Sequence, residues 1–134
     1  MNAGAGIVHS ERPTESIAKK GGSQEFIQLW INSPAKSKMK QPSYQFVAEQ
    51  DFDIILSNDK LIEHKVIAGN FKNSKGKFHG DSELNIVWSK GKKGGVDELN
   101  FQNDYNSALY IIKGSVIIND TEKIAKQNLI WLND

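Results

Sequence analysis

His9 and Glu11 are the residues whose types and spacing point most directly to chemistry. They stand two positions apart and follow the β-branched pair Ile7 and Val8. In an extended strand alternate side chains share a face, so the imidazole and the carboxylate would point the same way. Side by side they can supply half of a site for Fe(II), Mn(II), Ni(II) or Cu(II). The same two side chains can instead hydrogen-bond to each other or to water, and the spacing alone leaves both interpretations open.

The composition is that of a soluble, globular chain long enough for a domain of ordinary size. The sequence has 134 residues, of which 38% are hydrophobic and 25% charged, and its formal net charge is +1. This charge balance gives no global attraction to nucleic acid or to membranes. There is no cysteine, which excludes disulfides and thiolate zinc sites. No apolar run approaches the ~20 residues of a membrane helix. We therefore expect a cytoplasmic protein with no membrane segment and no direct nucleic-acid binding.

Short apolar segments separated by turn residues make up most of the chain after residue 45. Turn signals recur about every 8–12 residues, a spacing typical of β-sandwiches and small barrels. The sequence therefore predicts an all-β fold, with strands at residues 53–56, 61–68, 83–88, 96–101, 108–112, 115–118, 123–126 and 128–132.

The first third of the chain contains one strong strand candidate. Residues 26–32 are aromatic, β-branched and almost continuously apolar, which predicts a strand covered on both faces. The proline at position 34 ends it, and residues 35–39 are expected to form a single helical turn with Ser33 as its cap. Residues 14–23 are polar and contain paired glycines, so we predict a loop there.

Two further histidines stand apart from His9. His64 lies within the predicted strand at residues 61–68, and His79 lies in a polar, glycine-bearing loop two residues before Asp81. An isolated histidine in such surroundings is more often a solvated side chain than a ligand. We therefore expect both His64 and His79 at the surface.

Two motifs resemble those of a known family. The first is G-I-V-H-S-E at residues 6–11; the second is Q-L-W-I-N-S-P-A-K-S-K-M at residues 28–39, followed by P-S-Y-Q at residues 42–45. Together they are similar to the pirins, which belong to the cupin superfamily. The clear resemblance covers about residues 4–45, and the remainder is similar to a second pirin cupin in its pattern of strands and turns, as at residues 110–116.

The resemblance implies two tandem cupin domains, each a double-stranded β-helix or jelly-roll-like barrel. In the family the first barrel holds a divalent metal, usually Fe(II), through three histidines and a glutamate. By motif, His9 and Glu11 take the last two of these places, and Glu11 would also be the catalytic carboxylate. Intact relatives include metal-dependent quercetin 2,3-dioxygenases that act on flavonol-like substrates, and others are nuclear regulators of transcription.

The sequence departs from the family pattern at the other half of the metal site. The family's H-x-H pair lies upstream of His9 and is not part of this sequence, and no histidine stands shortly before Tyr105 to equip a second barrel. The resemblance thus implies a truncated bicupin: residues 1–12 as the tail strand of the N-terminal cupin, 13–45 as inter-domain strand and linker, and 46–134 as an incomplete C-terminal barrel. We expect the isolated chain to be inactive and to hold no metal unless a partner chain completes the site.

A non-catalytic role is the alternative that the sequence leaves open. Without the H-x-H pair, the chain is equally compatible with a regulatory or protein-binding cupin module, or with a remnant of a longer protein. A strand at residues 4–12 without its barrel would expose an unpaired edge. We therefore also expect a homodimer, or a partner chain, associated through the N-terminal strand.

Overall fold

Strands account for most of the regular structure. The computed structural model describes residues 1–102 and 104–132, which form two compact units, Met1–Asp97 and Glu98–Asp134. The only α-helix in these two ranges is α1, Glu15–Lys20, and two single 3₁₀ turns occur at Ala35–Ser37 and Glu49–Asp51. The all-β prediction is therefore confirmed.

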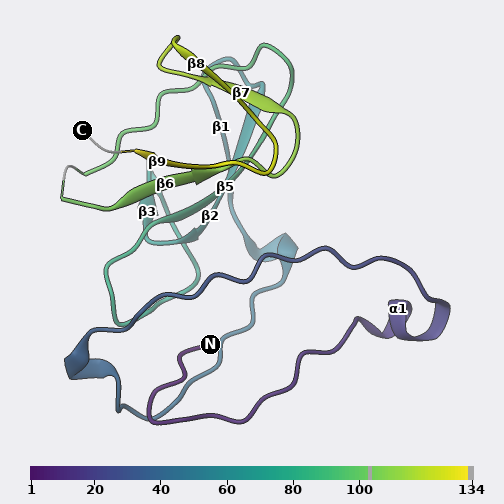
Figure 1. Ribbon diagram of the computed structural model, residues 1–134, viewed down its shortest axis with the longest axis vertical. Helices are drawn as coiled ribbons and strands as arrows, with labels where there is room; N and C mark the ends of the chain where they lie inside the picture. The colour runs from purple at the N-terminus through teal and green to yellow at the C-terminus, as the bar shows by residue number, and fades with distance from the viewer. Residues whose placement is uncertain (103, 133–134) are drawn as a thin grey trace. The chain divides into compact units, whose positions relative to one another are not determined.

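The core of the first unit is a three-stranded antiparallel sheet. Its strands are β1 (Ile54–Leu56), β2 (Ile62–Ala68) and β5 (Ile86–Gly91), in the order β1-β2-β5 (Figure 1). Because side chains alternate along a strand, one face of β2 carries His64, Val66 and Ala68, and all three are buried. The central strand thus buries a histidine among its apolar residues.

A tight hairpin connects β2 to the rest of the unit. It consists of β3 (Asn70–Phe71) and β4 (Ser74–Lys75), paired antiparallel. Gly76, just after β4, lies so close to the backbone of Ala68 that there is no room for a Cβ atom. The Phe78 amide then donates to the carbonyl of Ile67 at 3.0 Å. The hairpin is therefore held against β2 by backbone contacts that only glycine permits.

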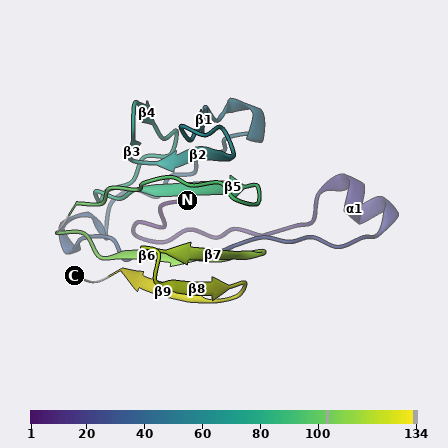
Figure 2. The same ribbon diagram turned by 90° about the horizontal axis from the view of Figure 1, so that it is seen from above.

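The second unit contains two antiparallel strand pairs, labelled in Figure 2. β6 (Ser107–Tyr110) pairs with β9 (Leu129–Leu132), and β7 (Ser115–Ile118) pairs with β8 (Glu122–Ala125). The β7–β8 turn places Asn119 at φ 49° and Asp120 at φ 55°. Two successive positive φ values are typical of a type I′ turn, which asparagine and aspartate tolerate well. The predicted strands at 108–112, 115–118, 123–126 and 128–132 are confirmed with shifts of a residue or two.

The predicted loop at residues 14–23 is wrong, because it contains α1. The Thr14 hydroxyl caps the helix by accepting the N–H of Ile17, Glu15 stands in the first turn, and Lys19 and Lys20 stand in the last. These charges match the helix dipole, and Gly21 at φ 72° ends the helix. The sequence contains these helix-end signals, but the loop prediction gave more weight to the polar composition of residues 14–23.

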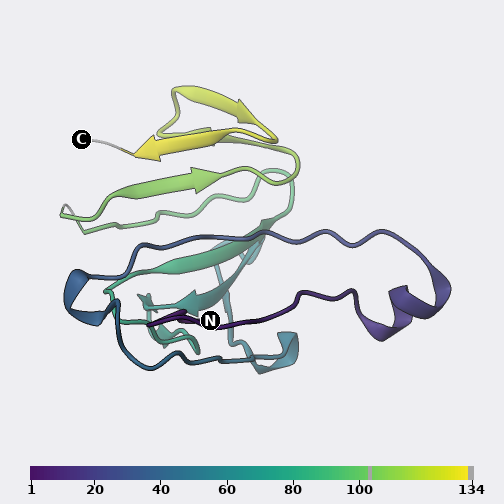
Figure 3. The ribbon, with the colours of Figure 1, turned by 60° about the horizontal axis from the view of Figure 1, so that its bottom comes forward.

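The predicted strands at residues 4–12 and 26–32 are also absent. Figure 3 shows these stretches as two long arms that lead into and out of α1. The described part of the chain gives neither arm a strand ladder, and Phe26 and Trp30 are 68% and 87% exposed. A strand requires a neighbouring backbone to share its hydrogen bonds, and composition alone does not supply one.

Two smaller predictions also differ from the structure. The helical turn at Ala35–Ser37 forms as expected, but Pro34 rather than Ser33 occupies its N-cap position, and no side chain caps it. Residues 96–101 form no strand. Val96 and Asp97 are bonded instead to side chains of the β1–β2 turn and of β2. Side-chain hydrogen bonds have replaced the predicted strand ladder there.

Candidate functional site

His9 and Glu11 lie close together on the arm that precedes α1. The distance from His9 Nε2 to Glu11 Oε1 is 3.8 Å, and the two side chains are 47% and 61% exposed. Gln28, on the arm that follows α1, donates from Nε2 to the same Glu11 oxygen at 2.9 Å. The predicted proximity of His9 and Glu11 therefore holds without a strand. Gln28 was not singled out from the sequence, although it opens the second motif.

These two donors do not by themselves fit a catalytic metal centre. Such a centre generally has at least three protein ligands. Over residues 1–102 and 104–132, no group of three or more His, Asp or Glu side chains is arranged to hold a metal ion. The His9–Glu11 pair is also exposed, and Gln28 occupies one carboxylate oxygen. We therefore assign no reaction step to a metal on this chain.

The second His-x-acid pair, at His79 and Asp81, has its polar groups engaged elsewhere. The main chain of His79 and the side-chain amide of Gln45 exchange two hydrogen bonds, each 3.1 Å long. Asp81 accepts from Lys40 Nζ and from Asn2 Nδ2, both at 2.6 Å, and the Lys40 contact, followed by the Asn2 contact, lowers the pKa of Asp81. His79 is exposed, as predicted. This pair fastens the N-terminal residues to the loop before β5.

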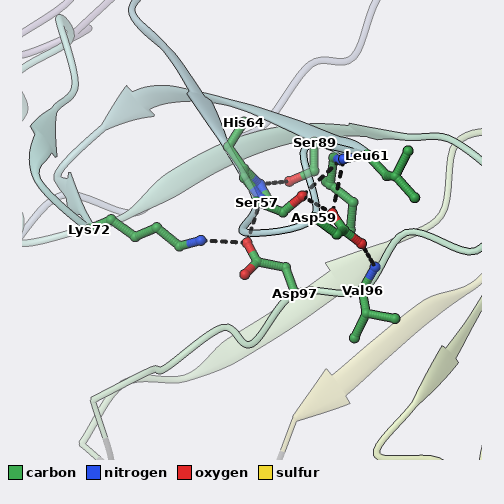
Figure 4. Close-up of polar contacts among 9 residues, drawn as sticks. Ser57, Asp59, Leu61, His64, Lys72, Ser89, Val96 and Asp97 are labelled. Carbon is green, nitrogen blue, oxygen red and sulfur yellow. Dashed lines mark hydrogen bonds and ion pairs between the residues drawn. The ribbon is translucent and has the colours of Figure 1, made fainter.

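The surface prediction for His64 is wrong, because only 1% of this residue is exposed. Its Nδ1 lies 2.8 Å from Ser89 Oγ, and its Nε2 lies 2.8 Å from Asp97 Oδ2 (Figure 4). The ring also lies against Phe71, with centroids 5.1 Å apart. The alternation Ile62, His64, Val66 along β2 carried the signal, since it places the histidine on the apolar face.

Lys72 completes this polar cluster, which we name the His64 centre (His64, Lys72, Ser89 and Asp97). Its Nζ lies 2.6 Å from Asp97 Oδ2, the oxygen that also faces His64, and the Asp97 side chain is only 7% exposed. Lys72 additionally lies over the Phe71 ring, 5.5 Å from its centroid. The carboxylate is thus buried between an ammonium and an imidazole, the compensation that a buried charge requires.

Asp59 joins the segment after β5 to the turn before β2. Its carboxylate accepts the hydroxyl of Ser57, the amide of Leu61 at 2.9 Å and the amide of Val96 at 2.7 Å. These hydrogen bonds, the Ser57 bond first among them, lower the pKa of Asp59. The Val96 bond positions Asp97, the next residue, over His64. Figure 4 shows the hydrogen bond from Val96 to Asp59 and the contact between Asp97 and His64.

Comparison with known proteins places the sequence in one family. No protein-family model matches it. A Pseudomonas aeruginosa protein with a provisional quercetin 2,3-dioxygenase name is 31% identical over 121 residues, covering 90% of this chain and 42% of that protein. Pirin-1 of Arabidopsis thaliana is 31% identical over 114 residues, covering 85% and 37%. The chain belongs to the pirin family.

A solved structure extends the likeness from sequence to fold. The crystal structure of quercetin 2,3-dioxygenase from Acinetobacter baumannii matches this pirin chain with a TM-score of 0.74 and 28% identity, covering 78% of the chain and 36% of the enzyme. The fold is therefore an all-β cupin fold, as the motifs predicted. The pirin chain spans less than half the length of each of these relatives. No helix in its described parts is long and apolar enough to cross a membrane.

Proposed function

We propose that this pirin chain contributes two donors, His9 and Glu11, to a divalent-metal site that further polypeptide completes. The observation that carries the proposal is the 3.8 Å approach of His9 Nε2 to Glu11 Oε1. It occurs within the motif that resembles the second half of the pirin metal site. The exposure of both side chains leaves them open to additional donors. By this proposal the isolated chain is not an oxygenase.

The relatives indicate what a completed site would do. One curated relative and the matching solved structure carry quercetin 2,3-dioxygenase names. We therefore infer Fe(II) or another divalent cation as the metal and a flavonol-like compound as the substrate of the complete assembly. In the corresponding domain assignment, residues 1–12 belong to the metal-binding cupin, 13–45 to the connection and 46–134 to the second cupin.

A non-catalytic binding module is the second candidate, and one observation favours it. Phe26, Leu29 and Trp30 are 68%, 62% and 87% exposed on the arm that follows α1. An exposed apolar run of this kind is typical of surfaces that associate with another polypeptide. In this case the chain would act through that surface, and His9 and Glu11 would have no role in metal binding.

Metal titration separates the two candidates. The isolated chain is titrated anaerobically with Fe(II), desalted and assayed for iron, and its oxygen uptake is then measured with quercetin. We expect weak, substoichiometric binding that His9→Ala removes and His79→Ala leaves intact, with no quercetin-dependent oxygen uptake above that of free Fe(II). Binding unchanged in His9→Ala would refute the metal proposal. A stoichiometric, active complex with monomeric protein in light scattering would show that the chain needs no additional donors.

A further inference from the structure

We propose that Ser89, His64 and Asp97 form a nucleophilic hydroxyl site that takes up the acyl group of an activated carboxylic ester. The three side chains lie in one line of hydrogen bonds, from Ser89 Oγ to His64 Nδ1 at 2.8 Å and from His64 Nε2 to Asp97 Oδ2 at 2.8 Å. A hydroxyl, a base that contacts it and a third group that orients the base are the parts of an activated serine. This site shares no residue with the His9–Glu11 pair.

Strand pairing and the Asp59 contact place the three residues together. His64 in β2 and Ser89 in β5 are directly opposite each other in the antiparallel ladder, so their side chains occupy the same face. Asp97 reaches the imidazole from the segment after β5, where Asp59 accepts the neighbouring Val96 amide at 2.7 Å. The arrangement therefore depends on the sheet and one anchored turn, and it lies wholly within the Met1–Asp97 unit.

The hydrogen bonds fix the tautomer of the imidazole. An ionised carboxylate only accepts hydrogen bonds, so Nε2 carries the proton that is donated to Asp97. In the neutral ring Nδ1 then has a free lone pair, which accepts the Ser89 hydroxyl proton. Lys72 Nζ, 2.6 Å from the same Asp97 oxygen, supplies the positive charge that compensates the buried carboxylate. When the ring is neutral, the base therefore faces the serine in the form that can remove its proton.

The three hydrogen-bonded residues differ in their exposure to solvent, and the difference suits catalysis. The His64 side chain is 1% exposed and the Asp97 side chain 7%, whereas Ser89, near the end of β5, is an exposed residue. The base and its orienting carboxylate are therefore shielded from water, while the residue that carries the nucleophile is exposed. A purely structural histidine would need the two hydrogen bonds but not a partner serine at the surface.

The reaction follows from these positions. Ser89 Oγ adds to the carbonyl carbon of the ester as its proton passes to His64 Nδ1, giving an imidazolium that faces Asp97. The carbon–oxygen bond to the leaving alcohol then breaks, leaving an ester on Ser89. The leaving group departs with the proton from His64, or as an anion while the proton goes to solvent. No oxidant, reductant or further reactant is required.

The full chain is tested with p-nitrophenyl acetate as the acyl donor. Release of p-nitrophenolate is followed by absorbance, and the acetylated residue is located by peptide mass spectrometry. Hydroxylamine removes a serine ester and leaves lysine amides, so it separates Ser89 from background lysine acetylation. We expect a hydroxylamine-sensitive acetyl group on Ser89. Ser89→Ala abolishes it, and Asp97→Asn slows its formation by about 100-fold, because His64 loses the carboxylate that orients it as the general base.

A control variant and a check of folding allow both a positive and a negative labelling result to be interpreted. Ser115→Ala, an exposed strand serine in β7, should leave the labelling rate unchanged. Circular dichroism and urea unfolding of each variant establish that the sheet is intact before rates are compared. If no acetyl group appears on Ser89, or if Asp97→Asn folds and labels at the wild-type rate, the proposal is overturned and the His64 centre is structural alone.

Discussion

Asp59 and Val96 are joined across 37 positions of sequence by one hydrogen bond, in which the Val96 amide donates to Asp59 Oδ2 at 2.7 Å. The other carboxylate oxygen of Asp59 accepts Ser57 and Leu61. One side chain therefore stabilises the β1–β2 turn and also holds the chain after β5 beside it. Because Asp97 follows directly, the same bond positions the carboxylate of the His64 centre.

Removal of the Asp59 carboxylate should loosen the segment after β5. In Asp59→Ala the amides of Leu61 and Val96 lose their acceptor, so we expect a lower urea midpoint and faster hydrogen exchange at Val96. Asp104→Ala removes an exposed aspartate in a loop of the second unit and serves as the matched control, with little change in either measurement. Slow Val96 exchange in Asp59→Ala would show that this bond does not hold the segment.

The same carboxylate should contribute to acid sensitivity. Because the pKa of Asp59 is lower in the folded chain than its ordinary value, the ionised form stabilises the fold. This contribution is complete above the ordinary aspartate pKa of about 4 and is lost as the pH falls through the folded pKa. The stability difference between wild type and Asp59→Asn, from urea unfolding, should be constant at neutral pH and shrink below about pH 4. A difference that persists undiminished to pH 2 would contradict this assignment.

His64 should be far more sensitive to substitution than His79. His64→Ala removes one partner of the buried Asp97 carboxylate and opens space beside Phe71, so we expect the free energy of unfolding to fall by about 3 kcal/mol. His79→Ala removes an exposed ring, and a change within about 0.5 kcal/mol is expected. Both are measured by urea denaturation. Equal, small effects would mean that the His64 centre contributes little to stability.

Local patterns predicted strands where alternation or a turn signal is clear. β2 follows from its alternation, and the β7–β8 hairpin follows from the turn at Asn119, which joins two strands adjacent in the chain. The strand prediction at residues 26–32 failed because their composition is typical of a strand, while the described chain provides no neighbouring strand to pair with it. The strand prediction at residues 96–101 failed because Val96 and Asp97 are bonded to the side chains of Asp59 and His64 instead. No local sequence pattern predicts these two contacts.

The two candidate sites also differ in how far local sequence predicts them. His9 and Glu11 could be predicted as neighbours, since their proximity depends only on two positions of chain. The His64 centre requires the β2–β5 register and the return of the chain to Asp97, which lie beyond local patterns. The alternation along β2 carried a signal for burial that the surface prediction for His64 did not use, and only the tertiary fold identified its partners.

The α1 helix should be locally unstable despite its good capping. It has six residues, none of them buried, and helices shorter than ~12 residues are marginal in water without tertiary packing. Hydrogen exchange at Ala18, whose amide donates to the Thr14 carbonyl, should therefore be nearly unprotected. The Phe78 amide, bonded to Ile67 of β2, should be strongly protected and is the internal reference. Comparable protection at both amides would show that α1 packs against another part of the protein.

Trp30 tests whether the arm after α1 has a partner in the isolated chain. Its side chain is 87% exposed, whereas Trp88 in β5 is 47% exposed. In Trp30→Ser we expect a change in unfolding free energy of no more than about 0.5 kcal/mol, because little apolar surface leaves water at this position on folding. The variant should also lose the fluorescence component that acrylamide quenches most strongly. Trp88→Ser is the comparison, with a larger loss of stability. The contrary result would be a loss of stability in Trp30→Ser that depends on protein concentration, together with a dimer in light scattering. The arm would then be the association surface of the second candidate function, with its apolar side chains buried between copies.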